Sequence, residues 1–173
     1  YKRQAALDGE TVATVTTDET GEARADNLPL GLGTARYEVV ETQAPAGFLL
    51  NRTTHIVDLT YADQKTPVVE ARLNVSDDYT KVDISKVDAS GEQEVEGAQL
   101  NLYGPDKTEI DSWTSSDKPH RVEHLAPGTY SLREMMSPRT YDLAEEITFE
   151  IKDTGEVQSV AMKDAPIEIK GQV

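Results

Sequence analysis

The sequence predicts an all-β protein built from two consecutive β-sandwich domains. Apolar and polar residues alternate over short stretches such as 146–151, and no segment keeps the 3.6-residue apolar period of an amphipathic helix. Turn-forming Gly, Pro, Asp and Ser separate these stretches at regular intervals. A third observation is a repeated strand motif whose glutamates, Glu41 and Glu134, lie 93 residues apart, the length of about one sandwich domain.

The repeated motif places a glutamate on the inward face of a strand. In 37–48 and in 130–141, an aromatic residue precedes the glutamate by four positions, a proline follows it by four, and another aromatic closes the motif three positions later. Alternation with period two puts this glutamate on the face of the apolar residues. A carboxyl group facing a core is costly as an anion and tends to stay protonated. A single copy fits a strand-end glutamate that leans into water, but two copies favour a functional role.

Each predicted strand is a short alternating stretch bounded by turn residues. In the first domain these stretches are 1–15, which holds the first strand before the polar turn at 16–22, and then 23–28, 37–43, 54–60 and 67–75. In the second domain they are 81–86, 95–103, a strand around Trp113, 120–125, 130–136, 146–151 and 157–162.

The two repeats are unequal at their starts. Residues 79–167 form a complete domain, in which the strand 81–86 carries Lys86 at its third inward position. Residues 1–78 form a truncated domain, because Tyr1 aligns with Tyr103 and the whole lysine strand is therefore missing. Residues 168–173 read as the start of a linker or of a next repeat. We therefore expect this chain to be part of a longer array of repeats.

Composition excludes several classes of function. The net charge is −15, which argues against nucleic-acid binding by a basic surface. Mean hydropathy is −0.54, and no window offers the roughly 20 apolar residues of a membrane-spanning helix. Without cysteine there is no disulfide framework, thiolate metal site or cysteine-based catalysis. The histidines, His55, His120 and His124, lack a convincing ligand set, so we expect no metal and no cofactor.

Three residues of the second domain form a candidate reactive trio: Lys86 on the first strand, Glu134 facing inward, and Asp164 at the end of the last strand. A buried lysine tends toward the nucleophilic neutral amine, and a buried aspartic acid is an electrophile. A protonated glutamate between them could move protons while an amide forms and one water leaves. From the spacing alone, a structural salt bridge is favoured over bond formation, since buried ion pairs are known.

The stretches 84–91, 95–103 and 127–134 resemble the CnaB-type (SpaA-like, prealbumin-like) domains of Gram-positive surface adhesins and pilins, and 16–23 and 40–48 match that family more closely. The resemblance implies tandem Ig-like or prealbumin-like CnaB sandwiches. It also implies a spontaneous isopeptide bond between Lys86 and Asp164, promoted by Glu134 as proton shuttle, with Asp153 a weaker partner. Where the family usually has T-x-A-P after the glutamate, this chain has 135–138, Met-Met-Ser-Pro.

In the first domain the resemblance makes Glu41 the equivalent of Glu134, with Asp77 or Asn74 as the possible partner on the last strand. We expect no bond there, because the lysine strand is missing and Lys2 lies at the wrong end of the wrong strand. A strand from outside this chain could fill the gap by β-augmentation. A solution mass that shows only monomer would contradict pairing with another chain.

The predicted function is a structural stalk or spacer repeat of a bacterial cell-wall-anchored adhesin or pilin, and it is not a turnover enzyme. The expected location is the extracellular cell surface, with anchoring through regions outside this chain. Expected partners are neighbouring repeats and a possible host ligand bound elsewhere in the protein. Two alternatives are a carbohydrate- or host-matrix-binding module on the same scaffold and an accessory domain of a secreted enzyme.

Overall fold

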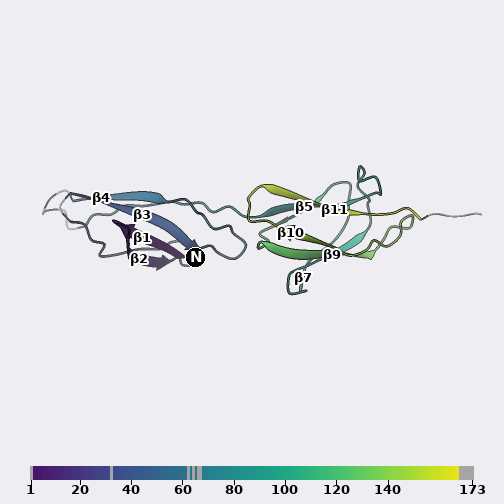
Figure 1. The fold of residues 1–173 in the computed structure, drawn as a ribbon, viewed down its shortest axis with the longest axis horizontal. Coiled ribbons are helices and arrows are strands. Elements are labelled where there is room, and N and C mark those ends of the chain that lie inside the picture. The colour runs from purple at the N-terminus through teal and green to yellow at the C-terminus, as the bar shows by residue number, and fades with distance from the viewer. Residues whose placement is uncertain (1, 32, 62, 64, 66–67, 168–173) are drawn as a thin grey trace, which may run out of the picture. The chain divides into compact units, whose positions relative to one another are not determined.

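Every regular element in the described part of the chain is a β-strand, which confirms the all-β prediction. The computed structural model describes all residues except 1, 32, 62, 64, 66–67 and 168–173. The chain divides into an N-terminal unit, Tyr1–Asp78, and a C-terminal unit, Tyr79–Val173 (Figure 1). Among the described residues, no helix is long and apolar enough to cross a membrane.

The C-terminal unit contains two sheets. One has the strand order β10-β9-β6-β7 and the other β11-β5-β8. The strands are β5 (Lys81–Val87), β6 (Gln99–Tyr103), β7 (Glu109–Thr114), β8 (His120–Glu123), β9 (Gly128–Met136), β10 (Ile147–Ile151) and β11 (Val157–Lys163).

The inward residues of both sheets form one apolar core. It includes Val82 and Ile84 from β5, Leu100 from β6 and Leu132 from β9, all at most 1% exposed. Because side chains alternate along a strand, this inward pattern also turns Lys86 of β5 and Glu134 of β9 toward the interior.

The first and last strands of the C-terminal unit lie side by side. β5 and β11 pair in parallel, with Met162 opposite Lys86. On its other edge, β5 pairs with β8 in the antiparallel sense. β5 is therefore the central strand of its sheet, and the end of β11 lies next to Lys86.

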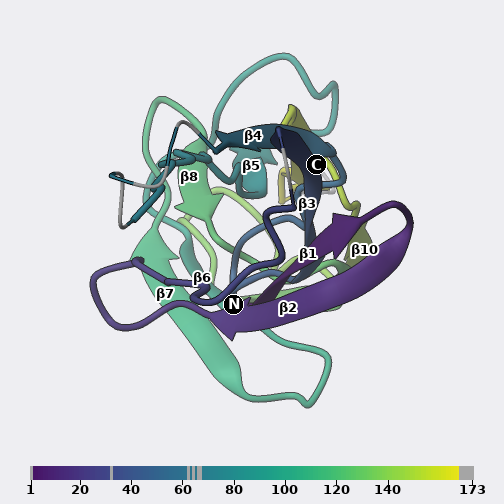
Figure 2. The ribbon, with the colours of Figure 1, turned by 90° about the vertical axis from the view of Figure 1, so that its left-hand side faces the viewer.

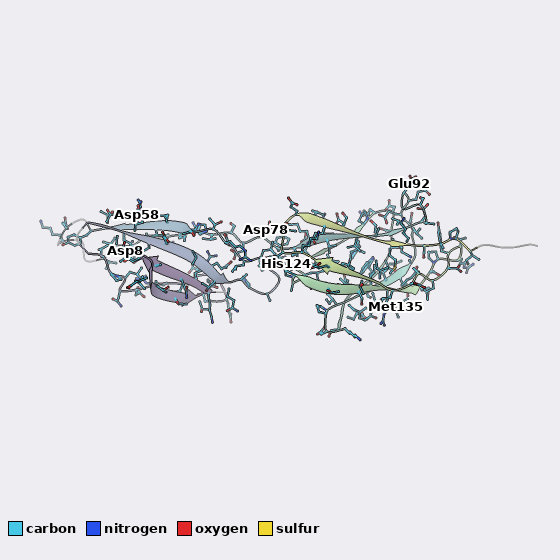
Figure 3. All side chains as sticks on the ribbon, viewed as in Figure 1. Asp8, Asp58, Asp78, Glu92, His124 and Met135 are labelled. Carbon is cyan, nitrogen blue, oxygen red and sulfur yellow. The ribbon has the colours of Figure 1, made fainter. Side chains whose placement is uncertain are left out.

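The N-terminal unit has a single sheet in its described residues, with the order β2-β1-β3-β4 (Figures 1 and 2). Its strands are β1 (Lys2–Leu7), β2 (Glu10–Thr16), β3 (Thr34–Gln43) and β4 (His55–Thr60). Asp8 and Gly9 connect β1 to β2 with φ values of 51° and 82°, the left-handed backbone that a two-residue hairpin turn needs (Figure 3).

Equivalent strand pairs reveal how the two units correspond. β1 pairs with β3 so that Arg3 is opposite Glu41, and β6 pairs with β9 so that Leu100 is opposite Glu134. β1, β2, β3 and β4 thus take the places of β6, β7, β9 and β10. The N-terminal unit has no described counterpart of β5, in agreement with the prediction that it lacks the lysine strand.

Three predictions for the N-terminal unit need correction or fall outside the structure. The stretches 23–28 and 67–75 were expected to be strands, but neither 23–28 nor the described residues 68–75 are assigned to one. In the C-terminal unit, the corresponding strands β8 and β11 pair only with β5, so without β5 these stretches have no ladder to join. The alignment of Tyr1 with Tyr103 falls on Tyr1, which lies outside the described residues. In the described strand pairs, Ala5 of β1 and Leu102 of β6 each lie opposite the residue two positions before the motif glutamate of the neighbouring strand. Ala5 therefore corresponds to Leu102.

Candidate functional site

Lys86 and Asp164 are brought together by the parallel pair of β5 and β11. Lys86 occupies the third inward position of β5 and is 1% exposed. Asp164 follows the last residue of β11, and its backbone N–H donates a hydrogen bond of 2.8 Å to the carbonyl of Val87. This bond extends the pairing of the two strands by one residue. The Asp164 side chain is consequently placed beside the lysine.

Glu134 reaches the same point from the opposite sheet. It lies on the inward face of β9, while its neighbour Met135 is 55% exposed on the outer side of the strand (Figure 3). Glu134 Oε2 accepts a hydrogen bond of 2.6 Å from the backbone N–H of Ala144. One carboxyl oxygen is therefore fixed by the backbone, and the carboxyl group is oriented by this bond.

The three side chains meet within the core. Lys86 Nζ lies 2.6 Å from Asp164 Oδ1 and 3.5 Å from Glu134 Oε2. None of the three side chains has exposed surface. Among the described residues, Lys86 Nζ, Glu134 Oε1 and both oxygens of Asp164 have no hydrogen-bond partner. The Lys86 amine and the Asp164 carboxyl group are thus in contact without the geometry of a hydrogen bond.

A pocket of about 310 Å³ is lined in part by Lys86. Lys86 and Ile84 contribute to its wall, together with Trp113 and His120. Trp113 also packs against the apolar core, and its ring stacks on that of His120 at a centroid distance of 4.2 Å. The pocket therefore leaves a small space beside Lys86.

Two kinds of chemistry fit three buried groups of this type. As ions, they form a lysine shared by two carboxylates, which carries one excess negative charge in a medium that solvates charge poorly. As neutral groups, they are an amine nucleophile and two carboxylic acids. Only the second state can condense to an amide.

The N-terminal unit contains a related cluster with a different cation. Arg3 Nη2 lies 3.3 Å from Asp77 Oδ1 and 3.6 Å from Glu41 Oε1. Glu41 Oε2 accepts a bond of 2.7 Å from the backbone N–H of Asn51. As in the C-terminal unit, the donor N–H comes ten residues after the glutamate. The motif glutamate is therefore held in the same way in both units.

The other residues considered for the N-terminal unit lie apart from this cluster. Asn74 is exposed, and Asp77 is the last-segment residue that contacts Arg3 of this cluster. Lys2 is exposed at the start of β1. In the C-terminal unit, Asp153 is exposed in the segment after β10, and Asp164 occupies the position next to the lysine.

Sequence reasoning did not identify Arg3 as a member of a site. Arg3, Ala5 and Leu7 alternate along β1, and this alternation does place the arginine on the inward face. The two backbone donors, at Asn51 and Ala144, were missed as well, because a backbone N–H leaves no residue-type signal.

The histidines make local contacts. His120 Nε2 lies 2.8 Å from Asp111 Oδ2, and the ring of His124 stacks on Tyr79 at a centroid distance of 4.1 Å. Within the described residues, no group of three or more potential ligands could hold a metal ion.

Comparison with known proteins identifies similar sequences and folds. The family model described as SpaA, a prealbumin-like fold domain, matches residues 2–73 and 80–166. No curated protein matches the chain. The chain resembles the solved structure of the Bacillus anthracis TIE protein, with 26% identity and a TM-score of 0.56 over 96% of this chain and 30% of that one. It therefore spans less than a third of that protein.

The structure search also matches two pilus proteins. A C-terminal fragment of the pilus adhesin SpaC from Lactobacillus rhamnosus GG has 16% identity and a TM-score of 0.51, covering 99% of this chain and 90% of the fragment. A pilus-presented adhesin, Cpa, has 39% identity and a TM-score of 0.37, covering 42% of this chain and 17% of its own.

Proposed function

Since the chain belongs to the SpaA family of prealbumin-like fold domains, we propose that its C-terminal unit forms an isopeptide bond between Lys86 and Asp164, promoted by Glu134. The observation that carries this proposal is the 2.6 Å contact between Lys86 Nζ and Asp164 Oδ1 in a site without exposed side-chain surface. Held reactants gain roughly 7 to 11 kcal/mol from proximity, which makes a condensation that is unfavourable in water feasible.

In the proposed reaction, the neutral amine of Lys86 attacks Cγ of the protonated carboxyl group of Asp164. Glu134 hydrogen-bonds to the carbonyl oxygen of Asp164 and carries a proton from the amine to the departing hydroxyl. The Nζ–Cγ bond forms, the Cγ–OH bond breaks and one water leaves, for which the pocket beside Lys86 offers space. Glu134 ends in its starting protonation state, so the reaction occurs once per molecule and needs no cofactor.

The bond supports a mechanical role. It joins the first and last strands of the C-terminal unit, β5 and β11, which already lie side by side. A pilus adhesin is among the solved structures with this fold, and this supports a place at the bacterial cell surface. We propose that the chain is a stalk or spacer segment of a cell-wall-anchored pilin or adhesin.

The test is the intact mass of the chain under denaturing conditions, beside the variants Lys86→Ala and Glu134→Ala. The wild type should be one water lighter than its sequence, and both variants should have their full calculated masses. Tandem mass spectrometry of a digest should recover a branched peptide that joins Lys86 to Asp164. A full calculated mass for the wild type would refute the bond. A branch at Asp153 would refute the assignment of the partner.

A further inference from the structure

Trp113 lies in one cross-strand row with Glu134. It is opposite Leu100 of β6, and Leu100 is opposite Glu134 of β9. Directly opposite residues place their side chains on the same face of a sheet, so all three face the interior. Trp113 accordingly packs against the apolar core. The tryptophan therefore lies on the β7 edge of the sheet, in the row that leads to the trio.

His120 faces the interior from the other sheet. It is opposite Ile84 of β5, two positions before Lys86, so these three residues share a face. Among the described strands, β7 and β8 are edge strands of their sheets. The His120 ring stacks on Trp113 with 15° between the ring planes, and its Nε2 is hydrogen-bonded to Asp111 Oδ2 at 2.8 Å. His120 of β8 thus joins its sheet to β7 along this edge of the sandwich.

This link forms part of the wall of the pocket beside Lys86. Ile84 and Lys86 of β5 line the pocket together with Trp113, His120 and residues of the connection between β7 and β8. The His120 side chain is 34% exposed, whereas the Lys86 side chain has no exposed surface. The histidine therefore lies at the boundary between this pocket and solvent.

Water that entered through this boundary would interfere with the condensation. Lys86 Nζ and both carboxyl oxygens of Asp164 have no hydrogen-bond partner within the described part of the chain. A water molecule in the pocket would bond to these atoms and compete with the 2.6 Å contact between the amine and the carboxyl group. Closed sites exclude water for this reason, and a small displacement of the reacting groups slows a reaction strongly.

On the premise that the Lys86–Asp164 amide forms, we propose that His120 is a positioning residue for its formation. By stacking on Trp113, the ring of His120 holds the tryptophan across the edge between β7 and β8 and closes the pocket against water. The role rests on the shape and stacking of the ring. The proton transfers remain with Glu134.

The test measures how fast the amide forms in newly made chain. The full chain is synthesised by cell-free translation, synthesis is stopped, and samples are quenched over time in acidic denaturant. The intact mass then gives the fraction of chains that are one water lighter. We expect His120→Ala to form the amide at least about tenfold more slowly than the wild type, because the opened wall admits water between the reacting groups.

Two further substitutions of His120 separate the ring from its nitrogen atoms. His120→Gln can still bond to Asp111 but has no ring, so it should be as slow as His120→Ala. His120→Phe keeps a ring that stacks on Trp113 but has no nitrogen, so its rate should stay within about threefold of the wild type.

His124→Asn is the matched control. It removes another stacked histidine of the same unit, whose ring lies on that of Tyr79 at a centroid distance of 4.1 Å. Asparagine tolerates the φ of 62° at this position. The control should form the amide at the wild-type rate.

Acrylamide quenching of the fluorescence of Trp113, the single tryptophan, tests the closure directly. These chains also carry Glu134→Gln, so that none contains the amide, and a cooperative thermal melt shows that each is folded. Quenching should increase with His120→Ala and His120→Gln. It should stay unchanged with His120→Phe and His124→Asn.

The possible results distinguish this role from the amide itself. A wild-type rate for His120→Ala or His120→Gln, or unchanged quenching in both, would overturn the positioning role alone. A rate for His120→Phe as low as that of His120→Ala would show that the histidine acts through its nitrogen atoms, which would also overturn it. A wild type that keeps its full calculated mass would refute the amide, and the role of His120 with it.

Discussion

Replacing Glu134 by glutamine separates the chemistry of this side chain from its packing. Glutamine has nearly the same shape, and its carbonyl oxygen can still accept the hydrogen bond from the backbone N–H of Ala144. It cannot take a proton from the amine and return it to a leaving hydroxyl. We therefore expect the Glu134→Gln chain to fold, to keep Lys86 beside Asp164, and to have its full calculated mass.

The size of the expected stability change follows from the loop that the proposed amide would close. Lys86 and Asp164 are 78 positions apart in the sequence. If the amide acts as a disulfide of that span does, restriction of the unfolded chain stabilises the fold by about 4 to 5 kcal/mol. For a domain of about 100 residues, each kcal/mol shifts the melting temperature by about 4 °C or more, so Glu134→Gln should lower Tm by about 20 °C.

The assay uses the fluorescence of Trp113, the single tryptophan of the chain, which lies in the C-terminal unit. Thermal melts of the wild type and of Glu134→Gln are compared with Glu41→Gln, a matched change at the equivalent position of the N-terminal unit. Glu41→Gln should leave both the mass defect and this melt unchanged. The reasoning is refuted if Glu134→Gln is also one water lighter. A loss of the amide with a Tm change below about 5 °C would refute the loop-entropy account.

Two further predictions concern ion pairs. Arg3→Met removes the cation that two buried carboxylates share. The N-terminal unit should therefore lose about 3 to 5 kcal/mol of stability, measured by hydrogen exchange of the β1 and β3 amides. Unchanged exchange would contradict a stabilising cluster. The hydrogen bond from Arg121 lowers the pKa of Asp83, although burial opposes this shift. The pair therefore stabilises the fold at pH values above the unfolded pKa of Asp, about 3.9. This stabilisation is lost as the pH falls through the lower pKa of Asp83 in the folded state. Asp83→Asn should therefore lower the fluorescence Tm at pH 7 but much less near pH 2, and an equal loss at both pH values would contradict the assignment.

Period-two alternation was sufficient to predict much of the C-terminal unit. It placed Lys86 and Glu134 on inward faces, because a strand with one buried face leaves each side chain only two directions. That Asp164 lies beside Lys86 depends on the parallel pairing of the first and last strands, which is a property of the whole fold. The family resemblance supplied this link, and alternation alone did not.

The errors in the N-terminal unit have a common physical origin. Segment 68–75 has the apolar residues of a strand, including Val69 and Val75. The pattern of residues within a segment does not indicate whether a neighbouring strand is present to pair with it. Arg3 was missed for a related reason. An arginine in a strand is usually solvated, and its burial here depends on two acids that lie distant in the sequence.

The adjacency of β5 and β11 also has a topological consequence. With an amide between Lys86 and Asp164, the intervening chain becomes a closed ring whose ends leave at neighbouring points. A protease that cuts one peptide bond of the ring, for instance in the turn at 104–108 between β6 and β7, would open the ring without separating Tyr79 from the residues after Asp164. The two halves would still migrate as one molecule under denaturing, reducing conditions. A segment built in this way keeps its covalent continuity after a single backbone break.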